Sequence, residues 1–499
     1  MTVGLSLVVA LVTTVSASFA GARQQEFWYR ISIRDRPCGY LHETVSEDDG
    51  RIRTESSERF RIDRGGSVVE LSQSLAFEED GRGAPLSATV RIETGGRPVR
   101  HDYDFPDGQP RDRSLEPGGS PARNDDDGVW LTPAEVRAFL KARISADAIR
   151  ISYRTLDPYA GMSPLLIEMT RLGTERHDVL GRTLDLGRWR VESDGSSIVS
   201  EELRTDQGVL VSSTADVGLG IMSIELVDRE IALEALNSTP PELLDSTLVP
   251  VANMVGRTDD SVTAGYRVRF ETETPRGLPD AGAQQVRTLG SGVLEVTIDA
   301  ASGSSASVAE RSDPAYLSAS AYIDLDDPSV RRFFRTLGRS PTDTTLEACE
   351  RLRTAVARRI SNKTFDVAFG SASDTLRSRS GDCTEHAVLL AAGFRLAGLP
   401  ARVATGLVHA SAAGFEHGAF AWHMWTQVMI DGVWWDFDAT RENRFDAGHL
   451  LVSTSSLDGG TGERALSEML PLLGRMRVEV ICVDGVVLDE PGLEIGDDR

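Results

Sequence analysis

The sequence of 499 residues predicts an α+β protein, in which a β-rich amino-terminal region precedes a buried helix packed on an antiparallel sheet. Three observations predict this fold class. Apolar and polar residues alternate in many segments of the first 300 residues, as in "FWYRISI" and "SVVELSQSLAF", a pattern typical of half-buried strands. The stretch after Cys383 is apolar on all sides, as in a central helix. Finally, Asp431-Gly432 lies between two apolar runs and indicates a two-residue hairpin turn.

The order of these patterns divides the chain into segments. A short helix within the amino-terminal region is expected to begin at Thr132-Pro133-Ala134-Glu135, which has the pattern of a capping box with proline at the first helical position. The expected segments are a signal peptide or anchor over 1–22, a β-rich domain over 25–235, a second small β domain or continuation over 245–305, and a carboxy-terminal α+β domain over 313–485.

The net charge of the chain limits its possible partners, and its first residues indicate where the protein is located. Lysine plus arginine number 53 and aspartate plus glutamate 76, giving a net charge of -23, and so acidic a surface repels phosphate backbones. We therefore expect no nucleic-acid partner. The apolar start of the chain contains Ser18-Phe19-Ala20, the small-x-small form of a signal-peptidase site. An exported protein is expected, periplasmic or extracellular, with membrane contact only through this segment if it stays uncleaved.

The chain has four cysteines, Cys38, Cys349, Cys383 and Cys482. They form no CxxC pair, so neither a zinc site nor a redox pair is supported, and no metal or cofactor is expected. An exported protein could form one disulfide, and the spacing does not indicate which pair. Cys349 falls on the apolar stripe of a helical pattern and is expected to be a core thiol.

Cys383 is expected in the first turn of the apolar helix, after the turn and cap residues Gly381-Asp382. Free backbone N–H groups and the helix dipole favour a thiolate there. The same N–H groups would stabilise an oxyanion on an attacked carbonyl. The alternative is a cysteine packed under the loop, and the segment alone leaves both interpretations open.

The hairpin turn sets the register of the two strands that it joins. With Asp431-Gly432 as the turn, Ile430 lies opposite Val433, and Trp425 then lies opposite Asp438. His423 lies two residues before Trp425 and therefore on the same face. His423 and Asp438 are then diagonal neighbours, within about 7–8 Å by backbone.

A thiolate nucleophile needs a base, and the base needs an orienting group. Cys383, His423 and Asp438 meet this requirement in that order, with Asp436 as the weaker orienter one residue pair further along. Taken singly, His423 could be a half-buried strand histidine and Asp438 a turn residue at a strand end. Their shared face, together with a cysteine at a helix start, favours a catalytic triad over three unrelated structural roles.

The segments "SGDCTEHAVLLAAGFRLAGLPARVATGLV" and "WHMWTQVMIDGVWWDFDAT" resemble the transglutaminase-like superfamily over roughly residues 345–455. His423-Met424-Trp425 stands where that family commonly has His-Ala-Trp, and Asp438-Ala439-Thr440 is a common variant of its strand end. The resemblance implies a papain-like α+β core, and the stretch "TFDVAFGSASDTLRSRSGDC" also resembles secreted bacterial members of the family. It further implies that Cys383 attacks a carbonyl, that His423 transfers protons and that Asp438 orients the imidazole.

The expected function is therefore cysteine-dependent acyl chemistry on peptide or carboxamide bonds, by a thiol hydrolase (a peptidase or amidase) or an acyltransferase. The thioester would pass to water or to an amine, and the motif does not distinguish the two. The alternative is a catalytically silent module that binds peptide or an envelope polymer. The expected partner is a peptide, a protein or a cell-envelope polymer, and the sequence identifies no substrate-binding residues.

Overall fold

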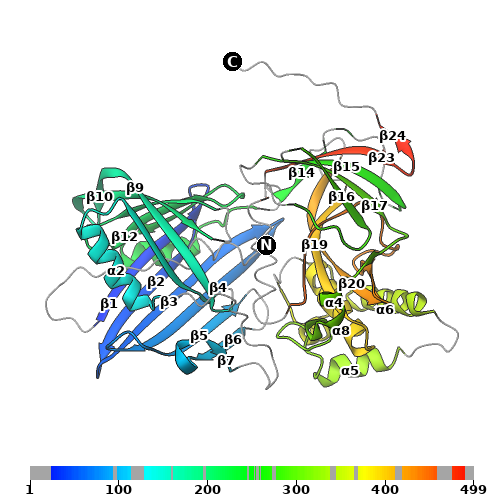
Figure 1. Ribbon diagram of the computed structural model, residues 1–499, viewed down its shortest axis with the longest axis horizontal. Coiled ribbons are helices and arrows are strands. Elements are labelled where there is room, and N and C mark those ends of the chain that lie inside the picture. Colours follow the sequence, from blue (N-terminus) through cyan, green and yellow to red (C-terminus); the bar gives the residue numbers. More distant parts are fainter. Residues whose placement is uncertain are drawn as a thin grey trace, which may run out of the picture. The chain divides into compact units, whose positions relative to one another are not determined.

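The chain divides into two compact units, each described here by itself. Unit 1 comprises Met1–Leu244, Phe365–Ala368 and Gly459–Pro471, and unit 2 comprises the rest. The predicted boundaries of the segments stay a prediction, and the expected signal peptide at 1–22 lies outside the described residues. The computed structural model (Figure 1) describes residues 24–93, 98–113, 129–158, 161–194, 198–243, 247–251, 253, 258, 260–271, 277–290, 292–337, 344–364, 369–410, 418–457, 472 and 475–488.

Unit 1 is built on an antiparallel sheet of 13 strands in the order β7-β6-β5-β4-β3-β2-β1-β13-β12-β11-β10-β9-β8. The β-rich character predicted for the amino-terminal region is thus confirmed. Its elements are β1 Gln24–Ile33, β2 Arg36–Asp48, β3 Arg51–Arg64, β4 Ser67–Asp80, β5 Pro85–Glu93, β6 Val99–Asp104, η1 Pro106–Gly108, β7 Arg111–Asp112, α2 Pro133–Ser145, β8 Arg150–Asp157, β9 Ser163–Val179, β10 Arg182–Ser193, β11 Ser200–Arg204, β12 Leu210–Asp216, β13 Ile221–Leu226, α3 Arg229–Glu234 and η3 Ala235–Asn237.

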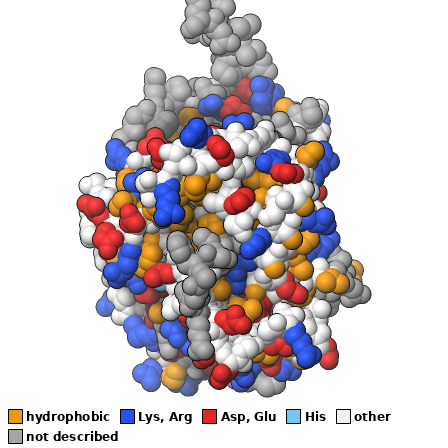
Figure 2. Space-filling model, turned by 90° about the vertical axis from the view of Figure 1, so that its left-hand side faces the viewer, with side chains coloured by type: hydrophobic (Ala, Val, Ile, Leu, Met, Phe, Trp, Pro, Cys, Tyr) orange, Lys and Arg blue, Asp and Glu red, His pale blue; other side chains and the backbone are white. Residues whose placement is uncertain are grey.

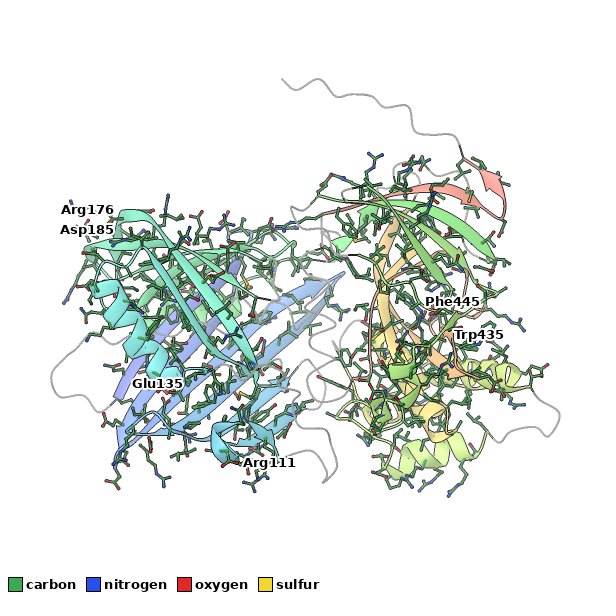
Figure 3. All side chains as sticks on the ribbon, viewed as in Figure 1. Arg111, Glu135, Arg176, Asp185, Trp435 and Phe445 are labelled. Carbon is green, nitrogen blue, oxygen red and sulfur yellow. The ribbon has the colours of Figure 1, made fainter. Side chains whose placement is uncertain are left out.

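Strands that lie far apart in the strand order of the unit 1 sheet contribute side chains to one apolar cluster, which shows that the sheet is curled. Phe77 and Val90 from β4 and β5 belong to the same apolar cluster as Leu156 from β8. Helix α2 begins with the predicted capping box, in which the Thr132 side chain and Glu135 satisfy each other's backbone N–H groups. Glu135 is labelled at this helix in Figure 3. The apolar face of α2 packs on β8, β9 and β10.

Unit 2 contains two antiparallel sheets and five α-helices among its described residues. One sheet has the order β18-β21-β20-β19-β22, with β14 also paired to β20, and the other has the order β16-β17-β15-β23-β24. The elements are β14 Val249–Pro250, β15 Thr263–Phe270, β16 Gln284–Gly290, β17 Val293–Asp299, β18 Ser304–Ser305, α4 Val308–Ser312, η5 Pro314–Tyr316, α5 Pro328–Arg335, α6 Thr345–Arg359, α7 Ala372–Ser378, α8 Cys383–Leu396, β19 Ala401–Ala410, β20 Ala419–Ile430, β21 Val433–Phe437, β22 His449–Ser455, β23 Met476–Val483 and β24 Val486–Val487.

Helix α8 is buried on all sides, as its apolar sequence predicts: every residue from Thr384 to Arg395 is buried. It lies against β19 and β20 and contacts α5, α6 and α7 (Figure 1). The Thr426 hydroxyl of β20 donates a hydrogen bond of 3.0 Å to the carbonyl of Ala387. These contacts fix the direction of the helix and hence the position of its first residue, Cys383.

The four cysteines all lie in described segments, and none of them forms a disulfide. Cys349 is fully buried on α6, as predicted for a core thiol, whereas Cys383 is only partly buried. On the face that Figure 2 shows, acidic and basic side chains are interspersed. Within the described residues, no helix combines the length and the hydrophobicity needed to span a membrane.

Close packing at Gly393 of α8 gives a first prediction. A Cβ atom at this position would lie 2.3 Å from a ring carbon of Phe334 on α5, whose ring is itself buried. We expect Gly393→Val to lower the free energy of unfolding by about 1–3 kcal/mol through overpacking, measured by urea denaturation. Gly290→Val is the matched control, since a Cβ there meets nothing within 4 Å. Equal stability losses in both variants would contradict the proposed packing role of Gly393.

Candidate active site

Cys383 opens helix α8, and the residues around it form a complete N-cap. The Asp382 side chain accepts a hydrogen bond of 2.9 Å from the Thr384 N–H. In return, the Glu385 carboxyl accepts one of 2.8 Å from the Asp382 N–H. The cap predicted at Gly381-Asp382 is therefore confirmed, and it holds the cysteine in the first helical turn.

The Glu385 side chain also connects the first turn of α8, which carries Cys383, to the segment before α7. Its second carboxyl oxygen accepts a hydrogen bond of 2.7 Å from the Gly370 N–H. Burial, reinforced by the charge of Asp382, raises the pKa of Glu385 to about 8. A Cβ at Gly381 would lie 2.4 Å from the Glu385 Cβ, so the turn before Cys383 has room only for glycine.

The hairpin of β20 and β21 has the predicted register. Ile430 pairs with Val433, and Gln427 pairs with Asp436. Asp438 follows directly after β21. His423 Nε2 lies 3.0 Å from Asp438 Oδ2, so the diagonal neighbours expected from the register are in hydrogen-bond contact.

Asp438 is fully buried and ionised. Burial alone would raise the pKa of this carboxyl, but the charges and hydrogen bonds of His423 and His449 hold it well below its usual range. Its Oδ1 accepts hydrogen bonds from the Thr440 N–H and hydroxyl, at 2.8 and 2.6 Å. An ionised carboxylate can only accept, so in the pair with Asp438 the proton is on His423 Nε2.

The backbone at Asp438 is held from α6 by a buried arginine. The guanidinium of Arg353 donates to the carbonyls of Asp438 at 3.3 Å, Arg441 at 2.7 Å and Glu442 at 3.2 Å. Three carbonyls of the loop after β21 therefore converge on one side chain, which fixes where this strand end lies.

The Cys383 side chain completes the cluster by hydrogen-bonding to His423. Since Nε2 of the imidazole faces Asp438, Nδ1 is the nitrogen left for the thiol. Burial would lower the pKa of His423, but the charge and hydrogen bond of Asp438, with a further contribution from Cys383, raise it to about 9. The structure thus brings all three predicted residues into contact, and their catalytic roles stay a prediction.

Asp436, the weaker candidate for the orienting group, is used elsewhere. One carboxyl oxygen accepts hydrogen bonds from the Trp425 indole at 2.7 Å and from the Gln427 amide at 2.8 Å. The other accepts from the Ala283 N–H at 2.7 Å. Asp436 therefore ties β20 and β21 to the loop before β16.

His449, the first residue of β22, is a member of the cluster that sequence reasoning missed. Its Nε2 lies 3.3 Å from the same Oδ2 of Asp438 that His423 contacts. Its Nδ1 lies 3.1 Å from Asp446 Oδ1 and 3.0 Å from the Asp446 carbonyl oxygen. The ring of Phe445, labelled in Figure 3, covers that of His449 at 4.4 Å between centroids. The only local signal was the three-residue spacing of Asp446 and His449.

His423, Asp438 and His449 are also the residues that could hold a metal ion, since each offers one ligand atom and these atoms lie within 4.8 Å of one another. Two imidazoles and one carboxylate suit several transition metals. The shared oxygen of Asp438, however, already lies at hydrogen-bond distance from both imidazoles, at 3.0 and 3.3 Å. Each imidazole nitrogen that faces Asp438 therefore has a carboxylate oxygen to which it can donate a hydrogen bond.

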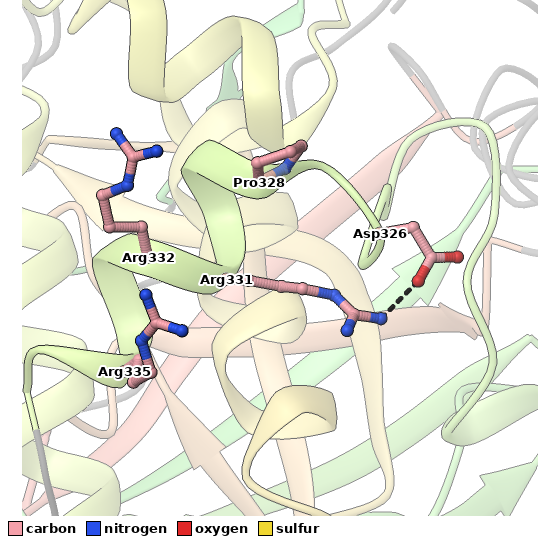
Figure 4. Close-up of a pocket in the computed structure, with 5 residues that line it drawn as sticks. All are labelled: Asp326, Pro328, Arg331, Arg332 and Arg335. Carbon is pink, nitrogen blue, oxygen red and sulfur yellow. Dashed lines mark hydrogen bonds and ion pairs between the residues drawn. The ribbon is translucent and has the colours of Figure 1, made fainter.

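A separate open pocket lies at α5 and contains none of these residues (Figure 4). Arg331 is ion-paired with Asp326 across it. The pocket is lined by Asp326, Pro328, Arg331, Arg332 and Arg335.

The raised pKa values of His423 and His449, both about 9, predict how stability depends on pH. A histidine whose pKa is higher in the folded than in the unfolded chain stabilises the folded state, and this contribution is complete at pH values below the ordinary histidine pKa of about 6.5. That contribution disappears as the pH rises through about 9. We expect the free energy of unfolding to fall between pH 7 and 10, measured by urea denaturation, and to fall less steeply in Asp438→Asn. Parallel slopes for the two proteins would contradict the assignment.

Comparison with known proteins shows a family match over the part of the chain that carries Cys383, His423 and Asp438. Residues 332–439 match the transglutaminase-like superfamily, and no curated protein matches the chain. Three solved structures show remote likeness, with TM-scores too low to establish a fold or an activity. The first is a putative cysteine protease from Cytophaga hutchinsonii, with 16% identity over 46% of this chain and 89% of that chain and a TM-score of 0.26. The second is a β-barrel-like protein of unknown function from Brucella abortus, with 11% identity over 41% of this chain and 95% of that chain and a TM-score of 0.31. The third is the periplasmic domain of TgpA from Pseudomonas aeruginosa bound to ethylmercury, with 16% identity over 37% of this chain and 91% of that chain and a TM-score of 0.22. The chain therefore contains a transglutaminase-like domain.

Proposed function

We propose that this domain performs cysteine-dependent acyl chemistry on peptide or carboxamide bonds, with Cys383 as nucleophile, His423 as base and Asp438 as the orienting group. The observation that carries the proposal is the position of His423 between two partners. One ring nitrogen faces the buried carboxylate of Asp438 at 3.0 Å, and the imidazole also hydrogen-bonds to Cys383. This is the arrangement of nucleophile, base and orienter that thiol catalysis requires.

In the proposed reaction, the proton of the Cys383 thiol passes to His423 Nδ1 before the attack, in line with the raised pKa of this imidazole, and the sulfur attacks the carbonyl carbon as a thiolate. The new C–S bond forms a tetrahedral oxyanion, which the N–H groups at the start of α8 would stabilise. The intermediate collapses with loss of the amine, which receives the proton from His423. Water or a second amine then attacks the thioester while His423 takes its proton. The C–S bond breaks, the acyl product leaves, and the proton on His423 is again shared with the Cys383 sulfur.

The finer fold assignment, a papain-like transglutaminase core, is part of the same proposal. It is supported by the elements on which the three residues lie: the thiol is on α8, whereas the base is on β20 and the orienting carboxylate is at the end of β21. Export to the periplasm or the cell exterior, and a peptide, protein or envelope-polymer substrate, are likewise proposed. The apolar segment at residues 1–22 with its small-x-small site supports export.

The proposal predicts that Cys383 is the most reactive thiol of the folded protein. After a short pulse of iodoacetamide at pH 6.5, mass spectrometry should show alkylation at Cys383 at least about tenfold faster than at a thiol of the unfolded chain. An ordinary thiol with a pKa of about 8.5 is mostly protonated at this pH. His423→Ala should remove the advantage, and Cys349, which is fully buried, should stay unlabelled. A Cys383 that reacts no faster than the unfolded thiol would contradict activation.

Turnover is tested with purified protein and a peptide library, with and without a primary amine, followed by product analysis. Cys383→Ser should abolish every product while leaving the unfolding midpoint unchanged. A free carboxylate at the attacked carbonyl would identify hydrolysis, and an amine adduct there would identify transfer, whereas the leaving amine or ammonia is released in both cases. Products that persist in Cys383→Ser would overturn the proposed nucleophile, and an activated thiol without products from any peptide would favour the silent binding module.

A further inference from the structure

His449 is a buried histidine whose two ring nitrogens both face carboxylates. Nε2 points to Asp438 and Nδ1 to the side chain and carbonyl oxygens of Asp446, at 3.0–3.3 Å. The side chain has no exposed surface. An ionised carboxylate and a carbonyl oxygen can only accept hydrogen bonds. Both nitrogens must therefore donate, and an imidazole that donates from both nitrogens is an imidazolium cation.

We propose that His449 is a positioning residue for the reaction proposed above, a protonated imidazolium that holds Asp438 on the side away from Cys383. His449 does not touch the thiol. It acts through Asp438 Oδ2, the oxygen that also contacts His423 Nε2. The carboxylate is thus fixed between two imidazoles, whose ring centroids lie 5.6 Å apart.

The charges of the cluster support this assignment. The charged and titratable groups that face His449 are His423 on β20, Asp436 on β21, Asp438 directly after β21, and Asp446 in the loop before β22. Asp446 is in turn ion-paired with Arg441. Cys383 and His423 share one proton and are together neutral, whichever of the two holds it. With His449 protonated, the remaining cations His449 and Arg441 balance the anions Asp438 and Asp446. With His449 neutral, the buried group would carry an unbalanced negative charge, which proteins rarely tolerate.

This balance has a consequence for His423. Without a second cation beside it, the negative charge of Asp438 would bind the proton of His423 too strongly for easy transfer to a leaving amine. The neighbouring cation on His449 draws on the same carboxylate oxygen and weakens that hold. His449 therefore adjusts how readily His423 gives up its proton, as well as where Asp438 lies.

The protonation of His449 can be read directly by ¹⁵N NMR of the ring nitrogens in the full chain. We expect both nitrogens to carry protons at pH 7.5, with the signals assigned by their loss in His449→Gln. A neutral tautomer at that pH would overturn the proposal. If His449→Gln does not fold, Asp446→Asn provides the second variant, because removal of the carboxylate beside Nδ1 should let His449 lose its proton closer to neutral pH.

The effect on His423 is read from the pH profile of Cys383 alkylation, whose alkaline inflection reports deprotonation of the imidazolium. We expect His449→Gln, which keeps a donor but loses the charge, to move this inflection upward by about one pH unit. His409→Gln is the matched control, since His409 is also buried but its Nδ1 contacts the Thr258 hydroxyl at 2.8 Å. An unchanged inflection in His449→Gln, or the same shift in both variants, would overturn the role.

The two proposals fail in different ways. If the wild-type protein shows no activated thiol, the proposed function fails, while the NMR result for His449 still stands on its own. If Cys383 is activated but His449 is neutral, or its replacement leaves the alkylation profile unchanged, only the positioning role fails.

Discussion

The carboxylate of Asp438 is the interaction on which the candidate site depends. It is fully buried, and a buried anion is stable only when its oxygens are hydrogen-bonded and its charge is compensated. Both conditions are met here: Thr440 donates to one oxygen, and His423 and His449 share the other. The direction of the His423 ring, and with it the nitrogen offered to Cys383, follows from where this carboxylate is held.

Three separate sets of contacts hold the residues of the site: two position Asp438, and the third positions Cys383. The hairpin register brings the end of β21 level with His423. The buried Arg353 of α6 gathers the carbonyls of the following loop. Helix α8 then presents Cys383 from the other side, with its own cap locked by Glu385. The site is therefore assembled from a helix start, a strand end and a loop, each fixed by contacts that involve no reacting atom.

The parts of this site that could be predicted from the sequence are those encoded by short segments. Asp431-Gly432 specifies a two-residue turn, and the turn alone sets which residues of the hairpin lie opposite each other. The apolar run after Cys383 and the cap before it specify a buried helix and its first residue. Both inferences needed no knowledge of the rest of the fold.

His449 and Arg353 could not be found in this way, because their partners are set by long-range packing. His449 opens β22, which pairs with β19 and not with the hairpin, so no local register connects it to Asp438. The sequence of α6 shows an arginine on an amphipathic helix, which usually lies in solvent. Its burial follows from the loop carbonyls that it meets, and the sequence around it contains no sign of them.

The place of β22 at the edge of its sheet has a consequence for any shortened form of the chain. A fragment ending at residue 439 would keep Cys383, His423 and Asp438 but lose β22, which is the outer partner of β19. The backbone of β19, buried along nearly its whole length, would become an unpaired apolar edge, the kind of edge that recruits strands from other molecules. Such a fragment would therefore tend to self-associate, although its sequence still contained every residue of the triad.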